Sequence, residues 1–333
     1  MRVSRSRRVW VFAAVCAVAA GAIVASLARA RRATGGEVPP LAAAQQLPSP
    51  PPAPFVMLRH LAPDASWGRV AVVPLALPDG PRFLSGLACV RVHYARGRGI
   101  CLTTVGPTGQ AVVFDAQFQP LRTLALTGAP SRARVSPSGR RGAVTVFEQG
   151  HSYADTGFST RTTLLDLEAD APLVDLEQFT VIHEGQPLRR VDFNYWGVTF
   201  GADDTRFYAT LAFGGTPYLV EGDLARREAR VLVANVECPS LSPDGTRLVF
   251  KRARRLADGG GWRLWVLDVA TGATRPLESE TRNIDDQVEW LDDGHVVYQF
   301  PAEDGNNVWA ASVDDAVPAR RFLTDAWSPA IAR

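Results

Sequence analysis

The chain has 333 residues, of which 46% are hydrophobic, so it is long enough to bury a large core, and all-β folds of this length often form one domain. The formal net charge is +2, but the charges are unevenly distributed along the chain. Residues 1–32 hold seven arginines and no acidic residue, which leaves 29 basic against 34 acidic residues in the remainder. Nucleic-acid binders usually carry a basic face or stripe, so this mildly acidic remainder argues against a nucleic-acid partner.

A basic and then apolar segment opens the chain. Four arginines within the first eight residues precede an uncharged stretch over residues 9–28. About 20 apolar residues span a bilayer as a helix, and arginines on the N-terminal side favour a cytoplasmic start. Residues 1–32 are therefore predicted to be a signal anchor with a transmembrane helix, and the remainder to be extracytoplasmic. The alternative is a cleaved signal peptide and secretion, since Ala28-Arg29-Ala30 has the small-x-small pattern of a cleavage site.

Residues 33–54 are rich in alanine and contain seven prolines. Proline fixes φ and lacks the amide hydrogen, so this stretch cannot build a core and is predicted to be an extended linker. The globular domain is expected over residues 55–333.

Cys89 and Cys101 flank a predicted compact hairpin over residues 90–99. Export implies an oxidising compartment, and facing strand residues have Cα atoms about 4.5–5.5 Å apart, which a disulfide can bridge. We therefore predict a cross-strand disulfide, with two buried thiols as the alternative. Cys238 has no evident partner and is expected to pack in the core.

Four similar corners recur between strand-like runs: Ser136-Pro-Ser-Gly, Gly201-Ala-Asp-Asp, Ser242-Pro-Asp-Gly and Leu291-Asp-Asp-Gly. Their spacings are 65, 41 and 49 residues, and periods of about 40 to 50 are typical of four-stranded propeller blades. The clearest blade comprises runs at 236–241, 248–250, 262–269 and 275–277. Five such blades can be traced, and runs at 55–61, 69–75 and 82–84 combine with the C-terminal 326–331 into a sixth. The sequence predicts an all-β, six-bladed propeller with four-stranded blades, closed by both ends of the chain.

Around Cys238-Pro-Ser-Leu-Ser-Pro-Asp-Gly-Thr-Arg-Leu-Val-Phe the chain resembles the TolB-like β-propeller family, which is related to the propellers of prolyl-oligopeptidase-type proteins. The resemblance covers about residues 85 to 313 and implies an extracytoplasmic interaction scaffold. TolB also carries an amino-terminal α/β domain. Residues 33–54 are too short and too rich in proline to replace it, so that family's envelope partners are not carried over to this chain.

In a propeller, the loops that lead into the inner strands gather at one mouth of the central channel, together with the loops between second and third strands. On this sequence they bring together a polar and acidic set, which is the predicted ligand-binding face. The set is His151, Tyr153, Asp155, Arg161, Asp192, Asn194, Glu237, Asp285, Asp286 and Gln287. The alternative for the aspartates is turn capping, because Asp often bonds neighbouring backbone amides. Converging acids suit calcium, but no calcium motif is present, and we expect neither a metal site nor a cofactor.

We therefore expect a monomeric, membrane-tethered scaffold that binds a protein, peptide or envelope polymer. The sequence contains no Gly-x-Ser-x-Gly hydrolase elbow and no His-x-His or His-Glu-x-x-His metal frame, which favours binding over catalysis. The alternative is an extracytoplasmic hydrolase or lyase that uses carboxylates of the channel face, and it would need two carboxyls about 5 to 10 Å apart.

Overall fold

The computed structural model describes residues 47–106, 108–148, 159–169, 172–302, 305–314 and 317–333. The predicted membrane helix over residues 9–28, the cleavage site near Ala30 and most of the linker lie outside these ranges, so they stay predictions. Within the described ranges, no helix is long and apolar enough to cross a bilayer.

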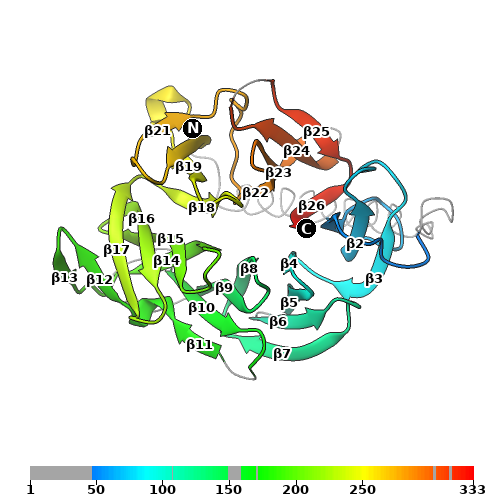
Figure 1. Ribbon diagram of the computed structural model, residues 1–333, viewed down its shortest axis with the longest axis horizontal. Helices are drawn as coiled ribbons and strands as arrows, with labels where there is room; N and C mark the ends of the chain where they lie inside the picture. The colour runs from blue at the N-terminus through cyan, green and yellow to red at the C-terminus, as the bar shows by residue number, and fades with distance from the viewer. Residues whose placement is uncertain (1–46, 107, 149–158, 170–171, 303–304, 315–316) are drawn as a thin grey trace, which may run out of the picture. The chain divides into compact units, whose positions relative to one another are not determined.

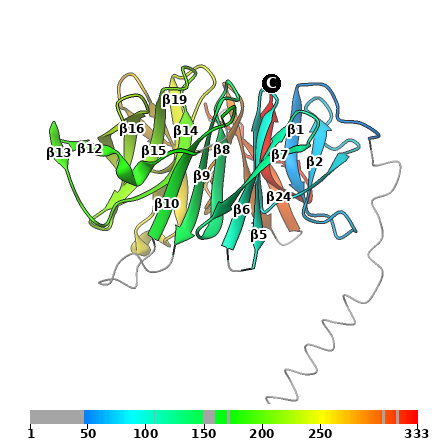
Figure 2. The ribbon, with the colours of Figure 1, turned by 90° about the horizontal axis from the view of Figure 1, so that it is seen from below.

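The described strands form six sheets that succeed one another around a ring (Figure 1), and Figure 2 shows the strands of the same sheets from the side. Blade 1 contains β26 (Ala326–Ala332), β1 (Phe55–His60), β2 (Arg69–Pro74) and β3 (Phe83–Ala88). Blade 2 contains β4 (Arg91–Ala95), β5 (Arg98–Val105), β6 (Thr108–Asp115) and β7 (Pro120–Leu126). Blade 3 contains β8 (Ala129–Val135), β9 (Arg141–Glu148), β10 (Ser159–Asp166) and β11 (Pro172–Asp175).

Blade 4 contains β14 (Asn194–Phe200), β15 (Arg206–Phe213), β16 (Thr216–Asp223) and β17 (Glu228–Ala234). Blade 5 contains β18 (Glu237–Leu241), β19 (Arg247–Ala253), β20 (Trp262–Asp268) and β21 (Thr274–Pro276). Blade 6 contains β22 (Glu289–Asp292), β23 (His295–Ala302), β24 (Gly305–Ser312) and β25 (Arg320–Leu323). The inner strands β26, β4, β8, β14, β18 and β22 contact one another in succession and back to the start. The six-bladed, four-stranded propeller is confirmed.

The recurring corners of the sequence join the first and second strands of the blades. At the clearest of them, the Gly245 N–H donates to the Ser242 carbonyl at 2.9 Å, and Gly245 has a φ of +73° that a side chain would strain. The Ser242 hydroxyl accepts the Arg247 N–H at 2.9 Å and so fixes the start of the next strand. The turn at Ser136 repeats both bonds. The same turn residues are therefore needed in successive blades, which explains why the corner motif recurs along the sequence.

Both ends of the described propeller close the ring in one sheet. Strand β26 lies antiparallel to β1, with Phe55 opposite Ala332 and Val56 opposite Ile331. The pairing covers a sheet edge that would otherwise present free backbone groups. The predicted shared closure is confirmed.

The disulfide between Cys89 and Cys101 is present, with a Cα–Cα distance of 5.4 Å. The register differs from the expected one, because Cys101 on β5 faces Val92 on β4, and Cys89 lies in the segment that precedes β4. The free Cys238 is buried, as expected.

Blade 4 departs from the prediction through a short outer hairpin, β12 (Thr180–His183) and β13 (Gln186–Leu188). Strand β12 pairs in parallel with β17, which extends this sheet to six strands. The outermost strand has Pro187 at its centre, and a proline blunts a sheet edge against further pairing.

Candidate functional site

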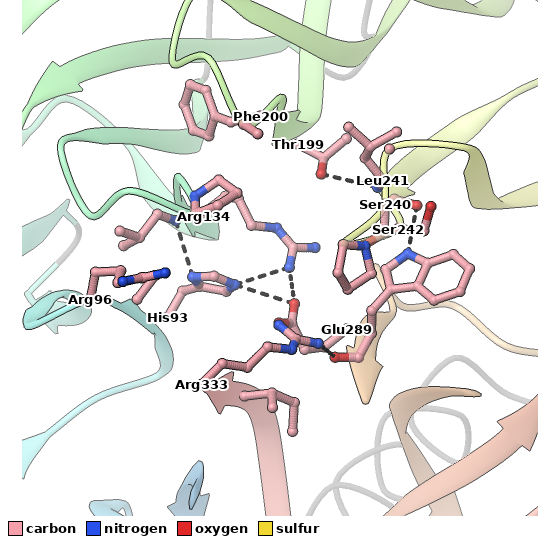
Figure 3. A pocket seen from close by; sticks show the side chains of 18 of the residues that line it. His93, Arg96, Arg134, Thr199, Phe200, Ser240, Leu241, Ser242, Glu289 and Arg333 are labelled. Carbon is pink, nitrogen blue, oxygen red and sulfur yellow. Dashed lines mark hydrogen bonds and ion pairs between the residues drawn. The ribbon is translucent and has the colours of Figure 1, made fainter. Parts of the chain in front are cut away.

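A cavity of about 250 Å³ lies where the inner strands end and turn outward, and all six inner strands contribute to its wall. We call this end of the channel the turn mouth. Its wall includes Tyr94 on β4, Val135 on β8, Thr199 on β14, Ser240 on β18, Glu289 on β22 and Ile331 on β26. Such a cavity lies on the axis of the propeller, and Figure 3 shows its polar side chains pointing toward one another.

Three buried polar side chains from different blades meet in the wall of this cavity (Figure 3). The His93 Nδ1 accepts the Val135 N–H at 3.0 Å, and the His93 Nε2 lies 3.0 Å from Arg134 Nη1 and 3.3 Å from Glu289 Oε2. Arg134 Nη1 forms an ion pair with the same carboxylate oxygen, and Arg134 Nη2 donates to the Val288 carbonyl at 3.1 Å. Blades 2, 3 and 6 are thereby joined across the channel.

The surroundings of this cluster lower the pKa values of His93 and Glu289. Burial lowers the pKa of His93, against the opposing charge of Glu289, so the imidazole is neutral at pH 7 in agreement with its hydrogen bonds. Burial alone would raise the pKa of Glu289, but the charge of Arg134 and the contact with His93 lower it to about 2. Arg134 and Glu289 are therefore both charged, and their opposite charges neutralise each other.

The rim of the turn mouth carries exposed charge. Arg96 and Arg333 are exposed at its edge, and Arg333 donates to the Trp290 carbonyl. On the opposite side, hydrogen bonds from the Ser242 hydroxyl and the Thr246 N–H lower the pKa of Asp244. The side chains that line the cavity thus include three guanidiniums and two carboxylates, with one guanidinium and one carboxylate paired in the interior.

The predicted ligand-binding residues that the structure describes lie elsewhere. Asn194 and Glu237 are the first residues of β14 and β18, so they lie at the other end of the inner strands, which we call the loop mouth. His151, Tyr153 and Asp155 lie outside the described residues. The ligand role of the whole predicted set stays untested.

At the loop mouth, Glu237 and Asp285 come together around Lys251. The buried Lys251 Nζ forms an ion pair with Asp285, lies 3.9 Å from Glu237 Oε2 and stands 4.7 Å from the ring centre of Trp262. The Trp262 indole donates to Glu237 Oε1 at 2.7 Å. Burial would lower the pKa of Lys251, but Cys238 and Asp285 raise it, so the ammonium stays charged. The Asp285 side chain remains 55% exposed.

Asp286 and Gln287 hold the inner strands together. The Asp286 side chain is 3% exposed, lies 3.4 Å from Arg91 and accepts the Gln299 N–H at 3.1 Å. The Gln287 amide donates to the carbonyls of Val198 at 3.0 Å and Pro239 at 2.9 Å, in blades 4 and 5. These contacts give both residues a structural role.

The remaining predicted residues are dispersed. Asp192 binds the Arg190 guanidinium at 2.6 and 3.0 Å, and this contact lowers the pKa of Asp192 to about 2. Asn194 accepts the Thr160 N–H at 2.8 Å. Arg161 lies 2.9 Å from Glu148 on blade 3, in the wall of a groove between blades 2 and 3.

Sequence reasoning missed His93, Arg134 and Glu289. A pattern that pointed to them was present, because Arg91 and His93 alternate on the predicted first hairpin and Arg132 and Arg134 alternate before the Ser136 corner. Side chains two apart on a strand share one face. Charged residues at such alternate positions of an inner strand indicate the channel side.

No family model and no curated protein matches this sequence. Among solved structures, TolB from Acinetobacter baumannii superposes with a TM-score of 0.60 and 16% identity, over 84% of this chain and 67% of that one. A putative TolB from Agrobacterium tumefaciens gives 0.50 and 11%, over 81% and 88%. A chain of a nidogen/laminin complex gives 0.55 and 13%, over 84% and 98%. At these identities the likeness shows the fold, and the TolB-like propeller is confirmed at that level.

Proposed function

We propose that this propeller is an interaction scaffold that binds a short acidic segment of a partner protein at the turn mouth. The cavity is too small for a folded domain, while the side chains of an extended segment fit its volume of about 250 Å³. The observation that carries the proposal is the pair of exposed guanidiniums, Arg96 and Arg333, above a buried pair that is already neutralised. An acidic segment would gain charge-assisted hydrogen bonds there.

Two observations support a protein as the partner. A chain of a nidogen/laminin complex, which is a complex between proteins, has a similar fold. The lining of the turn mouth also includes proline and aromatic residues, such as Pro137, Pro243 and Phe200, which suits a peptide. We further propose that residues 9–28 hold the propeller outside a membrane, with secretion after cleavage near Ala30 as the alternative.

The hydrolase or lyase alternative would have Glu237 and Asp285 as its nearby carboxyls, since both approach the Lys251 ammonium, but that ammonium pairs with them. Asp285 pairs with Lys251, Asp286 with Arg91, and Asp192 with Arg190. The low pKa of Asp192 keeps that carboxylate ionised at physiological pH, so it lacks a proton to donate as a general acid. The loop mouth is retained as a second place where a protein or envelope polymer would bind.

Site-specific photo-crosslinking in the living cell tests whether a protein binds and which mouth of the channel it binds. A photo-crosslinking amino acid replaces Ala202 at the turn mouth, Asp285 at the loop mouth or the exposed Arg226 between β16 and β17 as a control. We expect a discrete protein adduct from position 202, and its loss when Arg96→Glu and Arg333→Glu are added. An adduct only from position 285 would move the site to the loop mouth, and adducts that contain no protein would refute a protein partner.

A further inference from the structure

The exposed large apolar side chains of the propeller are concentrated at the loop mouth. The described residues include nine such side chains, and five of them lie at this mouth. These five, which we call the apolar tips, belong one to each of blades 1 to 5: Trp67, Val105, Phe147, Val191 and Leu256. The other four are dispersed over outer strands and their connections. Single exposed apolar residues are ordinary, but a set on one face indicates an interaction surface.

Strand direction places four of the tips at the loop mouth. The second strand of a blade runs antiparallel to the inner strand, so it ends at the loop mouth. Val105 and Phe147 lie at the ends of β5 and β9, and Trp67 and Leu256 lie in the loops that follow β1 and β19. In Figure 2 this mouth is the lower edge of the propeller, opposite the end marked C.

Val191 and Leu256 are the most exposed of the large apolar side chains in the described part of the chain. Val191 is fully exposed, and Leu256 is 93% exposed. Val191 lies at the loop mouth because its neighbour Asp192 accepts the N–H of Gly214, in the turn between β15 and β16, at 2.8 Å. Both side chains therefore project into solvent from neighbouring blades on the same face.

Guanidinium groups accompany these two tips. Val191 and Leu256 each follow two arginines and precede one aspartate. The aspartate pairs with the second arginine in both segments. The first arginine, Arg189 or Arg254, has no carboxylate within ion-pair distance among the described residues. Arg254 donates to a backbone carbonyl instead, so its charge stays uncompensated. Each tip thus has a cation beside it that can contact a phosphate.

Trp67 repeats the combination of an apolar tip with an arginine. The Arg59 guanidinium lies 4.7 Å from the centre of the Trp67 ring, and the indole is 59% exposed. Tryptophan is enriched where a bilayer meets water, because its ring is apolar and its N–H is polar. Arginine lays its stem along apolar surface and keeps its head group among polar groups.

The spacing of the tips favours a flat partner. Blades 1 and 4 lie opposite each other in a ring of six, so a single peptide or small ligand would not contact both Trp67 and Val191. A bilayer extends under the whole face, and its fluid surface admits separate apolar side chains without a matching shape.

We propose that the loop mouth docks on the surface of a phospholipid bilayer. Trp67, Val191 and Leu256 enter the boundary between head groups and acyl chains, and Arg189 and Arg254 contact lipid phosphates. The proposal goes beyond the function proposed for the turn mouth, which would face away from the bilayer and stay open to its partner. It also does not depend on a membrane helix over residues 9–28.

Fluorescence quenching on vesicles tests the contact. In the full-length chain, a solvatochromic amino acid replaces Leu256, Trp67 or, as a control at the opposite face, Leu77, which is about as exposed as Trp67. The vesicles contain phosphatidylcholine and phosphatidylglycerol in equal parts, with brominated acyl chains as the quencher. We expect a blue shift and quenching at positions 256 and 67 and neither at position 77. Absence of quenching at 256 and 67, or equal quenching at all three positions, would overturn the proposal.

Two matched double variants test the arginines. Arg189→Gln with Arg254→Gln should lower the ratio of quenched to unquenched protein at position 256 roughly thirtyfold. Arg206→Gln with Arg226→Gln removes two exposed charges from the opposite face and should change the ratio less than about twofold. Thermal unfolding of both variants controls for loss of fold. Equal losses in the two variants, or none in the first, would overturn the proposal. A photo-crosslinker at position 256 that captures protein instead of lipid in the living cell would overturn it as well.

Discussion

Glu289→Gln is the perturbation that most directly tests the electrostatics of the turn mouth. The change keeps the shape of the side chain and removes its charge. In the native protein this carboxylate receives Arg134 and faces the Nε2 of His93, and all three side chains are buried. The substitution therefore leaves the Arg134 guanidinium buried without its counter-charge, which is costly in a site that excludes water.

The expected magnitude follows from the pKa of Glu289. A carboxyl whose pKa falls from 4.5 to about 2 on folding contributes about 3 kcal/mol to the free energy of unfolding at neutral pH. Because the folded pKa is depressed, this contribution is fully present above about pH 4.5. It is lost as the pH falls toward about 2. Glu289→Gln should therefore be about 3 kcal/mol less stable at pH 7, and the difference should shrink across that acidic window.

Urea unfolding at a series of pH values, followed by tryptophan fluorescence, measures both quantities. Glu184→Gln serves as the matched control, since Glu184 is exposed in the β12–β13 turn, and its effect should stay within about 0.5 kcal/mol. A deficit in Glu289→Gln that stays constant from pH 7 to pH 2 would show that the charge of the carboxylate is not what stabilises the site. Equal stability of variant and native protein at pH 7 would refute the buried ion pair itself.

Three further predictions address other parts of the propeller. Replacing both Cys89 and Cys101 with Ser should lower the free energy of unfolding by about 3 kcal/mol, and reductant should destabilise the native protein but not this variant. Gly197 has a φ of +63°, and a Cβ at this position would lie 2.6 Å from the backbone of β18, so Gly197→Ala should lower the free energy of unfolding in urea by about 2–4 kcal/mol. Gly215 has open space around it, so the control Gly215→Ala should lower it by about 1 kcal/mol. Equal losses in the two variants would contradict the clash with β18. His93 is buried with a lowered pKa, so native stability should decline as the pH falls below about 6.5, and His93→Gln should remove that decline in the same assay.

The blades could be predicted from the sequence because their turns are local. The turn at Ser242 is held by hydrogen bonds from Gly245 and Arg247, all within six residues. The spacing of such turns can therefore be recognised in the sequence alone. The β12–β13 hairpin was not predicted, because β12 is held by parallel pairing with β17, almost fifty residues further along the chain. A pairing between strands so far apart in sequence is not indicated by any short sequence motif.

The candidate site was harder to predict because neighbouring residues take opposite roles. Asp285 keeps a 55% exposed side chain at the loop mouth, while the adjacent Asp286 is 3% exposed and tied to Arg91. The sequence pattern treats the two alike. Which of two adjacent residues faces the channel depends on strand register, and register is settled by the pairing of whole strands.

The closure of blade 1 by β26 also determines when folding can finish. Strands β1 to β3 leave the ribosome before the other described strands, yet the strand that completes their sheet is the last of those described. During synthesis the opening blade must wait, incomplete, until the other five have emerged. Long-range pairing of this kind slows folding and exposes unfinished sheets. Removal of β26 would thus leave blade 1 without its inner strand.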